Sequence, residues 1–134
     1  MEANELRIGN YVNCPKDGQN PFRIDLFEYA SKGIGKFGMI YDKNTHPLTW
    51  YLQDLKPISL TEEWLLKFGL ERFPWGWVLS WGKRPQDHKL LISCCKYKNK
   101  YWVELGNGLR IEFPYVHTFQ NFIILTGHEL IIKQ

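Results

Sequence analysis

The sequence predicts an α+β fold, strand-rich, with a small curled sheet or barrel-like arrangement and two short-to-medium helices. Short apolar and aromatic runs recur between turn residues, which is typical of strands. Capping signals bracket one helix, and an apolar stripe at helical spacing marks a second. The chain has 134 residues, the usual length of one domain. We therefore expect a single domain over residues 1–134, with a strand-rich half at about 1–58 and a helix, hairpins and second helix in 59–134.

Strands of the first half are expected where apolar and polar side chains alternate, or where apolar side chains cluster between glycine and proline. Gly9-Asn10 predicts a turn or bulge. We interpret Gly33, Gly35 and Gly38 as a loose connection between strands. The expected strands are residues 6–12, interrupted by that turn, then 22–27, 37–41 and 50–52.

The first helix is predicted over Thr61–Phe68. Thr61 is a favoured N-cap residue, because its hydroxyl can accept a hydrogen bond from a free N–H of the first turn. Leu60 and Leu65 have the spacing of a hydrophobic staple. Gly69 follows as the residue that can end the helix in a left-handed conformation.

Further strands are predicted at residues 75–81, where Trp75, Trp77, Leu79 and Trp81 alternate, and at 90–94. A hairpin is predicted from residues 101–105 and 109–113, because the Asn-Gly between them suits a tight turn. Glu104 and Glu112 are expected to face each other across this hairpin. Ordinary surface charges explain such a carboxylate pair better than acid–base chemistry does.

The second helix is predicted over Pro114–Thr126. Proline is favoured in the first turn, and Val116, Phe119 and Ile123 make an apolar stripe at helical spacing. Gly127 is expected to end the helix. Residues 129–132 are interpreted as a short terminal strand or a packed tail.

Composition and charge indicate a cytoplasmic protein without a membrane anchor. Hydrophobic residues make up 44% of the chain, but no apolar run approaches the roughly 20 residues of a membrane span. The N-terminus lacks the basic and apolar regions of a secretory signal. Cys14, Cys94 and Cys95 are odd in number and partly adjacent, so reduced thiols are expected. The oligomeric state is left open.

No pattern in the sequence predicts an enzyme. Phosphate-binding, dinucleotide-binding, nucleophile-elbow and zinc-protease motifs do not occur, and the four histidines lack zinc-site spacing. We therefore expect no catalytic residues, no metal and no cofactor.

A basic segment stands out against the modest net charge of +3. Residues 83–100 hold six basic side chains and one acidic one. Lysines and tyrosines alternate at its end, which suits a platform for single-stranded nucleic acid, but lysines that block edge-to-edge strand pairing are the alternative. The candidate binding residues here are Lys83, Arg84, Lys89, Lys96, Tyr97, Lys98 and Lys100.

An aromatic turn is the second candidate surface. Trp75 and Trp77 lie in Phe73-Pro74-Trp75-Gly76-Trp77, where proline and glycine predict a turn that cannot bury every ring. Exposed tryptophans are frequent hot spots for protein partners. Both tryptophans are candidate binding residues. We expect Trp75 to be partly exposed, whereas Trp77 and Trp81 fit a core.

Three blocks of the chain resemble a known family. They are Glu5-Leu6-Arg7-Ile8-Gly9-Asn10, then Leu60-Thr61-Glu62-Glu63-Trp64-Leu65-Leu66-Lys67-Phe68-Gly69, then Tyr115-Val116-His117 with Gln120-Asn121 and Leu125-Thr126-Gly127. The pattern resembles a family of small uncharacterised proteins associated with Bacteroidetes phages and prophages. Phe119 departs from the leucine expected before Gln120, and residues 75–100 have no counterpart. The resemblance carries over no catalytic residues.

Two functions are consistent with these features. The resemblance implies a phage or mobile-element accessory protein that acts by protein–protein binding to host or defence machinery. An anti-defence inhibitor of an RNA-guided nuclease (an anti-CRISPR type) is one form of this function. The alternative is a small nucleic-acid-binding module, with RNA as a candidate ligand, that uses the basic segment at residues 83–100.

Overall fold

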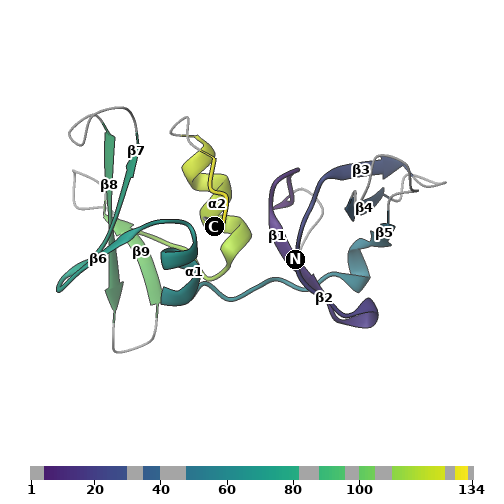
Figure 1. Cartoon of the computed structure of the whole chain (residues 1–134), viewed down its shortest axis with the longest axis horizontal. Helices are drawn as coiled ribbons and strands as arrows, with labels where there is room; N and C mark the ends of the chain where they lie inside the picture. Colours follow the sequence, from purple (N-terminus) through teal and green to yellow (C-terminus); the bar gives the residue numbers. More distant parts are fainter. Residues whose placement is uncertain are drawn as a thin grey trace. The chain divides into compact units, whose positions relative to one another are not determined.

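The computed structural model describes residues 5–29, 35–39, 48–81, 88–95, 100–104, 110–125 and 129–132 (Figure 1). It confirms a strand-rich α+β fold. The described strands form three antiparallel sheets of two, three and five strands, and each of these sheets is open rather than barrel-like. The chain divides into two compact units, Met1–Ile58 with Val116–Asn121, and Ser59–Tyr115 with Phe122–Gln134. The expectation of a single domain stays a prediction.

Two small sheets build the first unit. In one, β1 and β2 pair with an irregularity between Val12 and Cys14. In the other, the strand order is β3-β4-β5. Short 3-10 turns, η2 (Pro15–Asp17) and η4 (Leu52–Asp54), follow β1 and β5. The strands are β1 (Tyr11–Cys14), β2 (Gln19–Arg23), β3 (Leu26–Tyr29), β4 (Gly35–Met39) and β5 (Leu48–Tyr51).

The prediction of one strand over residues 22–27 is wrong, because the chain passes from one sheet to another in the middle of this segment. Strand β2 ends at Arg23, and β3 begins at Leu26. Between them, the N–H of Ile24 donates to the carbonyl of Asn10 at 2.8 Å. The N–H of Asp25 donates to the carbonyl of Gly38, also at 2.8 Å. These two adjacent residues therefore bond to different neighbours, which local alternation cannot reveal.

Gly35 and Gly38 are strand residues rather than part of a loose connection, while Gly33 lies outside the described residues. In β4 they stand opposite Tyr29 and Leu26 of β3. A Cβ atom at Gly38 would lie 2.5 Å from the backbone carbonyl oxygen of Leu48. A Cβ atom at Gly35 would overlap the ring of Phe27. Close approach to a backbone oxygen explains Gly38, whereas the neighbour at Gly35 is a side-chain ring.

The core of the first unit joins residues from both sheets. Apolar side chains that are at least nine-tenths buried pack into one cluster, against which Leu52 also packs. The cluster includes the free thiol of Cys14, which is fully buried. Its members are Leu6, Val12, Cys14, Phe22, Ile24, Phe37, Trp50 and Leu55.

In the second unit, helix α1 (Glu62–Lys67) confirms the first predicted helix. Thr61 occupies the N-cap position with extended backbone angles, but its side chain makes no capping hydrogen bond, contrary to expectation. The C-terminus follows the Schellman pattern: the N–H of Gly69 donates to Leu66 and that of Leu70 to Leu65. Gly69 has a φ of 89°, the left-handed conformation that glycine adopts at little cost.

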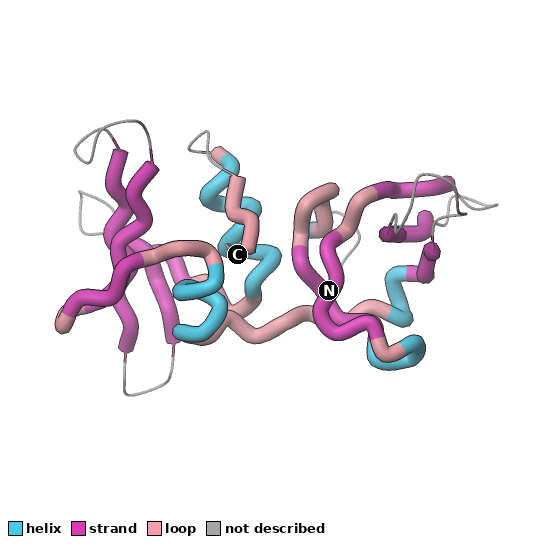
Figure 2. Tube along the Cα trace, viewed as in Figure 1, coloured by secondary structure: helices cyan, strands magenta, loops and turns pink. Residues whose placement is uncertain are grey.

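The strands of the second unit form one five-stranded antiparallel meander (magenta in Figure 2). Its order is β10-β9-β8-β7-β6, so each strand lies beside its neighbour in the sequence. The predicted hairpin is confirmed as β9 and β10, but its turn lies outside the described residues. The strands are β6 (Glu71–Phe73), β7 (Gly76–Trp81), β8 (His88–Cys95), β9 (Lys100–Glu104) and β10 (Arg110–Glu112).

The register of that hairpin separates the two glutamates that were expected to face each other. Arg110 stands opposite Glu104, and Trp102 stands opposite Glu112. The carboxylate of Glu112 lies 3.5 Å from Nζ of Lys100 in an exposed ion pair. Charge pairing along the hairpin thus replaces the carboxylate pair.

Helix α2 (Val116–Ile124) starts two residues later than predicted. The carbonyl of Pro114 accepts from the N–H of Leu60, and Tyr115 forms an isolated antiparallel bridge with Ser59. Pairing to the segment before α1 thus holds the backbone extended up to Val116. Gly127 lies outside the described residues. In the following tail Leu130 is buried, as a packed tail predicts. No helix in the described part of the chain is long and apolar enough to cross a membrane.

Candidate protein-binding surface

The aromatic turn joins β6 to β7 at one edge of the five-stranded sheet. Phe73 stands opposite Gly76, so Pro74 and Trp75 form a two-residue connection. The side chain of Trp75 is 55% exposed and that of Phe73 is 37% exposed. Their rings are stacked, with centroids 5.3 Å apart and planes 13° apart. The predicted partial exposure of Trp75 is confirmed.

Local sequence explains why these rings stay on the surface. Proline restricts its own φ angle, which suits a turn. Gly76 has no side chain, so the position across the strand pair offers Phe73 no side chain to pack against. The three residues of β6 are all exposed, and β6 is the last strand in the sheet order. Trp75 is therefore the ring against which Phe73 packs.

On the opposite face of β6, the side chain of Arg72 contacts residues of β7 and α1. Arg72 stands opposite Trp77, and its guanidinium lies 6.0 Å from the centre of that indole ring. Nη1 of Arg72 also lies 2.6 Å from Oε1 of Glu62 in α1. Trp77 is 5% exposed and packs against the ring of Tyr101. Of the two candidate tryptophans, Trp77 is thus a core residue as its alternation predicted, and only Trp75 offers its ring to a partner.

The basic segment stays a prediction, because Lys83, Arg84, Lys96, Tyr97 and Lys98 lie outside the described residues. For the two remaining candidates the structure gives partial information. Lys89 belongs to β8, where it stands opposite Ser80, and only its backbone is described. Lys100 begins β9 and forms the ion pair with Glu112.

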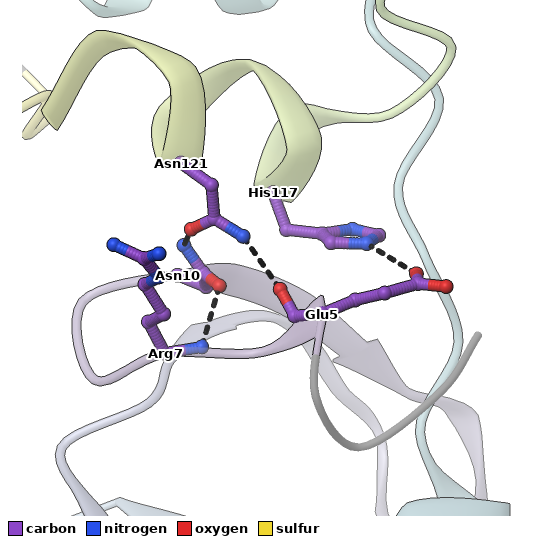
Figure 3. A network of polar contacts seen from close by, with 5 residues as sticks. All are labelled: Glu5, Arg7, Asn10, His117 and Asn121. Atoms are coloured by element: carbon purple, nitrogen blue, oxygen red, sulfur yellow. Dashed lines mark hydrogen bonds and ion pairs between the residues drawn. The ribbon is translucent and has the colours of Figure 1, made fainter. Parts of the chain in front are cut away.

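A polar cluster in the first unit was not predicted from the sequence (Figure 3). Nδ2 of Asn10 donates to Oδ1 of Asn121 at 2.9 Å. Nδ2 of Asn121 donates to the backbone carbonyl of Glu5 at 2.5 Å. Oδ1 of Asn10 accepts from the N–H of Arg7 at 2.8 Å. Two side-chain amides thus connect the N-terminal segment to α2 in one continuous chain of hydrogen bonds.

Gln120 adds two hydrogen bonds that are fully buried. Its Oε1 accepts from the N–H of Tyr11 at 2.9 Å, and its Nε2 donates to the carbonyl of Gly9 at 2.9 Å. The side chain pairs with the backbone much as a neighbouring strand does. It therefore satisfies polar groups at the start of β1 that burial would otherwise leave unpaired.

His117 completes this cluster. Its side chain is fully buried, and Nε2 lies 3.3 Å from Oε2 of Glu5. Burial lowers the pKa of His117 below its ordinary value of 6.5, although the hydrogen bond and the charge of Glu5 act in the opposite direction. At neutral pH the imidazole is therefore uncharged and donates its Nε2–H to the carboxylate.

The cluster holds the N-terminal segment in place rather than forming a reaction centre. Each of its amides is paired with another amide or with backbone groups, and Glu5 is its one carboxylate. Both segments belong to the blocks on which the family resemblance rests, but the sequence did not reveal that they meet. The available signal was polar: among the buried residues of α2, His117 and Gln120 are polar and the others are apolar.

The described residues include no group of three or more His, Cys, Asp or Glu side chains that could hold a metal ion. Comparison with protein-family models, curated proteins and solved structures returned no match to this chain.

Proposed function

We propose that this protein is a non-enzymatic binding protein that recognises a protein partner through the stacked rings of Phe73 and Trp75. The observation that carries the proposal is the exposure of two stacked aromatic side chains at the edge of a sheet. A single exposed apolar side chain is ordinary, but a contiguous aromatic pair is more typical of an interaction site. Tryptophan is also the residue most enriched among interface hot spots.

The way the turn is held supports this proposal. Strand β6 is paired to β7 along its whole length, and Arg72 ties it to α1 through Glu62. The backbone on which the rings are mounted is thus ordered before a partner arrives. Preorganisation lowers the entropy lost on binding, so more of the contact energy appears as affinity.

We propose further that the partner belongs to host or defence machinery, and that the protein acts by occluding a surface of it. An RNA-guided nuclease is one candidate target. This part of the proposal is supported by the resemblance in residues 5–10, 60–69 and 115–127 to phage-associated proteins. Occlusion requires no catalytic group, which agrees with the absence of a catalytic motif in the sequence.

The test is a pull-down from a Bacteroidetes lysate, with and without nuclease treatment, using the wild type, Trp75→Ala and Leu66→Ala. Leu66 is a matched control, because it is exposed to a similar extent (47%) and belongs to the same unit. We expect to capture a protein partner whether or not nuclease is added. Its binding free energy should weaken by at least about 2 kcal/mol in Trp75→Ala and stay unchanged in Leu66→Ala. A folded Trp75→Ala that binds every captured protein as tightly as the wild type contradicts the proposal.

A further inference from the structure

The edge strand β6 separates its charges onto two faces. Successive side chains of a strand point to opposite sides, so Glu71 and Phe73 share one face, and Arg72 points to the other. Arg72 is engaged on its own face by Glu62 and by the ring of Trp77. Within β6, the face that carries Phe73 therefore has the carboxylate of Glu71 as its charged group.

Glu71 differs from the other acidic side chains of this unit whose contacts are described. Glu62 pairs with Arg72 at 2.6 Å, and Glu63 pairs with Lys67 at 3.1 Å. Glu71 is exposed, stands opposite the apolar Val78, and forms no ion pair with any described residue. Its charge is thus available to a partner.

A carboxylate beside an aromatic pair suits a cation. The faces of aromatic rings attract ammonium and guanidinium groups, and tryptophan does so most strongly. A guanidinium can also stack on a ring while it donates hydrogen bonds to a carboxylate. We infer that Glu71, Phe73 and Trp75 together bind an arginine or lysine side chain in a basic segment of the protein partner.

This inference rests on the proposed function and names the chemistry of its partner. Charge complementarity decides between partners: an acidic segment would place its carboxylates next to Glu71, where like charges repel. A purely apolar segment would bury the carboxylate of Glu71 without a compensating bond. Of the three kinds of segment, only a basic one can both pair with the carboxylate of Glu71 and place a cation against the rings.

The test uses a random peptide library displayed on phage, selected on the wild type and counter-selected on Trp75→Ala. We expect the enriched peptides to share an arginine or lysine. Calorimetry with a synthetic copy of one such peptide should show binding at least about 5-fold weaker to Glu71→Gln. Glu63→Gln is the matched control, because it removes an exposed carboxylate of the same unit (74% exposed) and should change affinity less than about 2-fold.

A charge swap makes the test specific. Glu71→Lys should lose the peptide, and replacing the shared basic residue of the peptide by glutamate should restore part of the binding, because the ion pair returns but the attraction of the rings for a cation does not. Circular dichroism and thermal melting of each variant confirm that its fold is intact. Peptides that require Trp75 but lack a basic residue, or that bind Glu71→Gln as tightly as the wild type, overturn this inference and leave the proposed function standing. A selection without any Trp75-dependent peptide also overturns it, while the lysate experiment decides the proposed function separately.

Discussion

The imidazole Nε2 of His117 lies 3.3 Å from Oε2 of Glu5, a residue 112 positions earlier in the chain. The histidine is fully buried, whereas the carboxylate of Glu5 is 41% exposed. The pair therefore joins a buried group of α2 to a group that solvent can reach. Its strength should depend on pH, because the imidazole can take up a proton only at the cost of burying a charge.

The first prediction concerns that dependence. Since burial lowers the pKa of His117 in the folded state, the unfolded chain takes up the proton first as pH falls. The contribution of His117 to the free energy of unfolding is thus complete above pH 6.5 and is lost as pH falls below it. The slope should reach at most about 1.4 kcal/mol per pH unit. Urea unfolding between about pH 5 and 8 measures it.

His117→Gln is the comparison for this experiment. Glutamine does not titrate, so the variant should lack the part of the slope that belongs to the imidazole. Parallel stability profiles of wild type and variant across this pH range would show that His117 does not control the acid sensitivity.

The second prediction concerns Gln120, whose side chain replaces a strand partner for Gly9 and Tyr11. Gln120→Ala should lower the free energy of unfolding by about 2–4 kcal/mol, because it leaves a buried donor and a buried acceptor unpaired. Gln53→Ala is the matched control, since Gln53 is exposed and should change stability by no more than about 0.5 kcal/mol. Equal effects of the two substitutions in urea unfolding contradict the role assigned to Gln120.

The third prediction concerns the close approach at Gly38. Gly38→Ala should destabilise the protein by about 1–3 kcal/mol, because the new methyl group meets the carbonyl oxygen of Leu48. The methyl group of Thr49 is a second neighbour, at 2.8 Å from the same position. Adding Thr49→Ser should not restore stability, since the backbone oxygen remains. Recovery of wild-type thermal stability in the double variant would identify the threonine as the obstacle instead.

The fourth prediction concerns the nucleic-acid alternative. We expect the wild type to show no sub-micromolar affinity for single-stranded RNA at roughly 150 mM salt. If it does bind, neutralising Lys96, Lys98 and Lys100 together should flatten the dependence of log affinity on log salt by up to about 2–3 units, since each phosphate contact contributes ~0.7–0.9. Fluorescence anisotropy at several salt concentrations measures both quantities. Tight binding with that change in slope would favour the nucleic-acid module over the protein-binding function.

Features that depend on neighbouring residues were determined by the sequence alone. Helix α1 was predicted from local signals, and its end at Gly69 follows the expected left-handed conformation within a single turn, although Thr61 occupies the N-cap position without a side-chain capping bond. The β9–β10 hairpin was predicted from the Asn-Gly between its strands, and the exposure of Trp75 was predicted from the Pro and Gly that flank it. For the end of α1 and for Trp75 the physical cause lies only a few residues from its effect, whereas the turn between β9 and β10 lies outside the described residues.

Only the tertiary structure decided which distant groups meet. The chain changes sheet at Ile24–Asp25 because Asn10 and Gly38 offer bonding partners in different directions. His117 finds Glu5 across 112 positions, and no local pattern encodes such a pairing. The stacking of Trp75 on Phe73 likewise depends on the pairing of Phe73 with Gly76 across the turn. Long-range register follows from how whole sheets bury their apolar sides, so it is a property of the folded chain and not of any short segment.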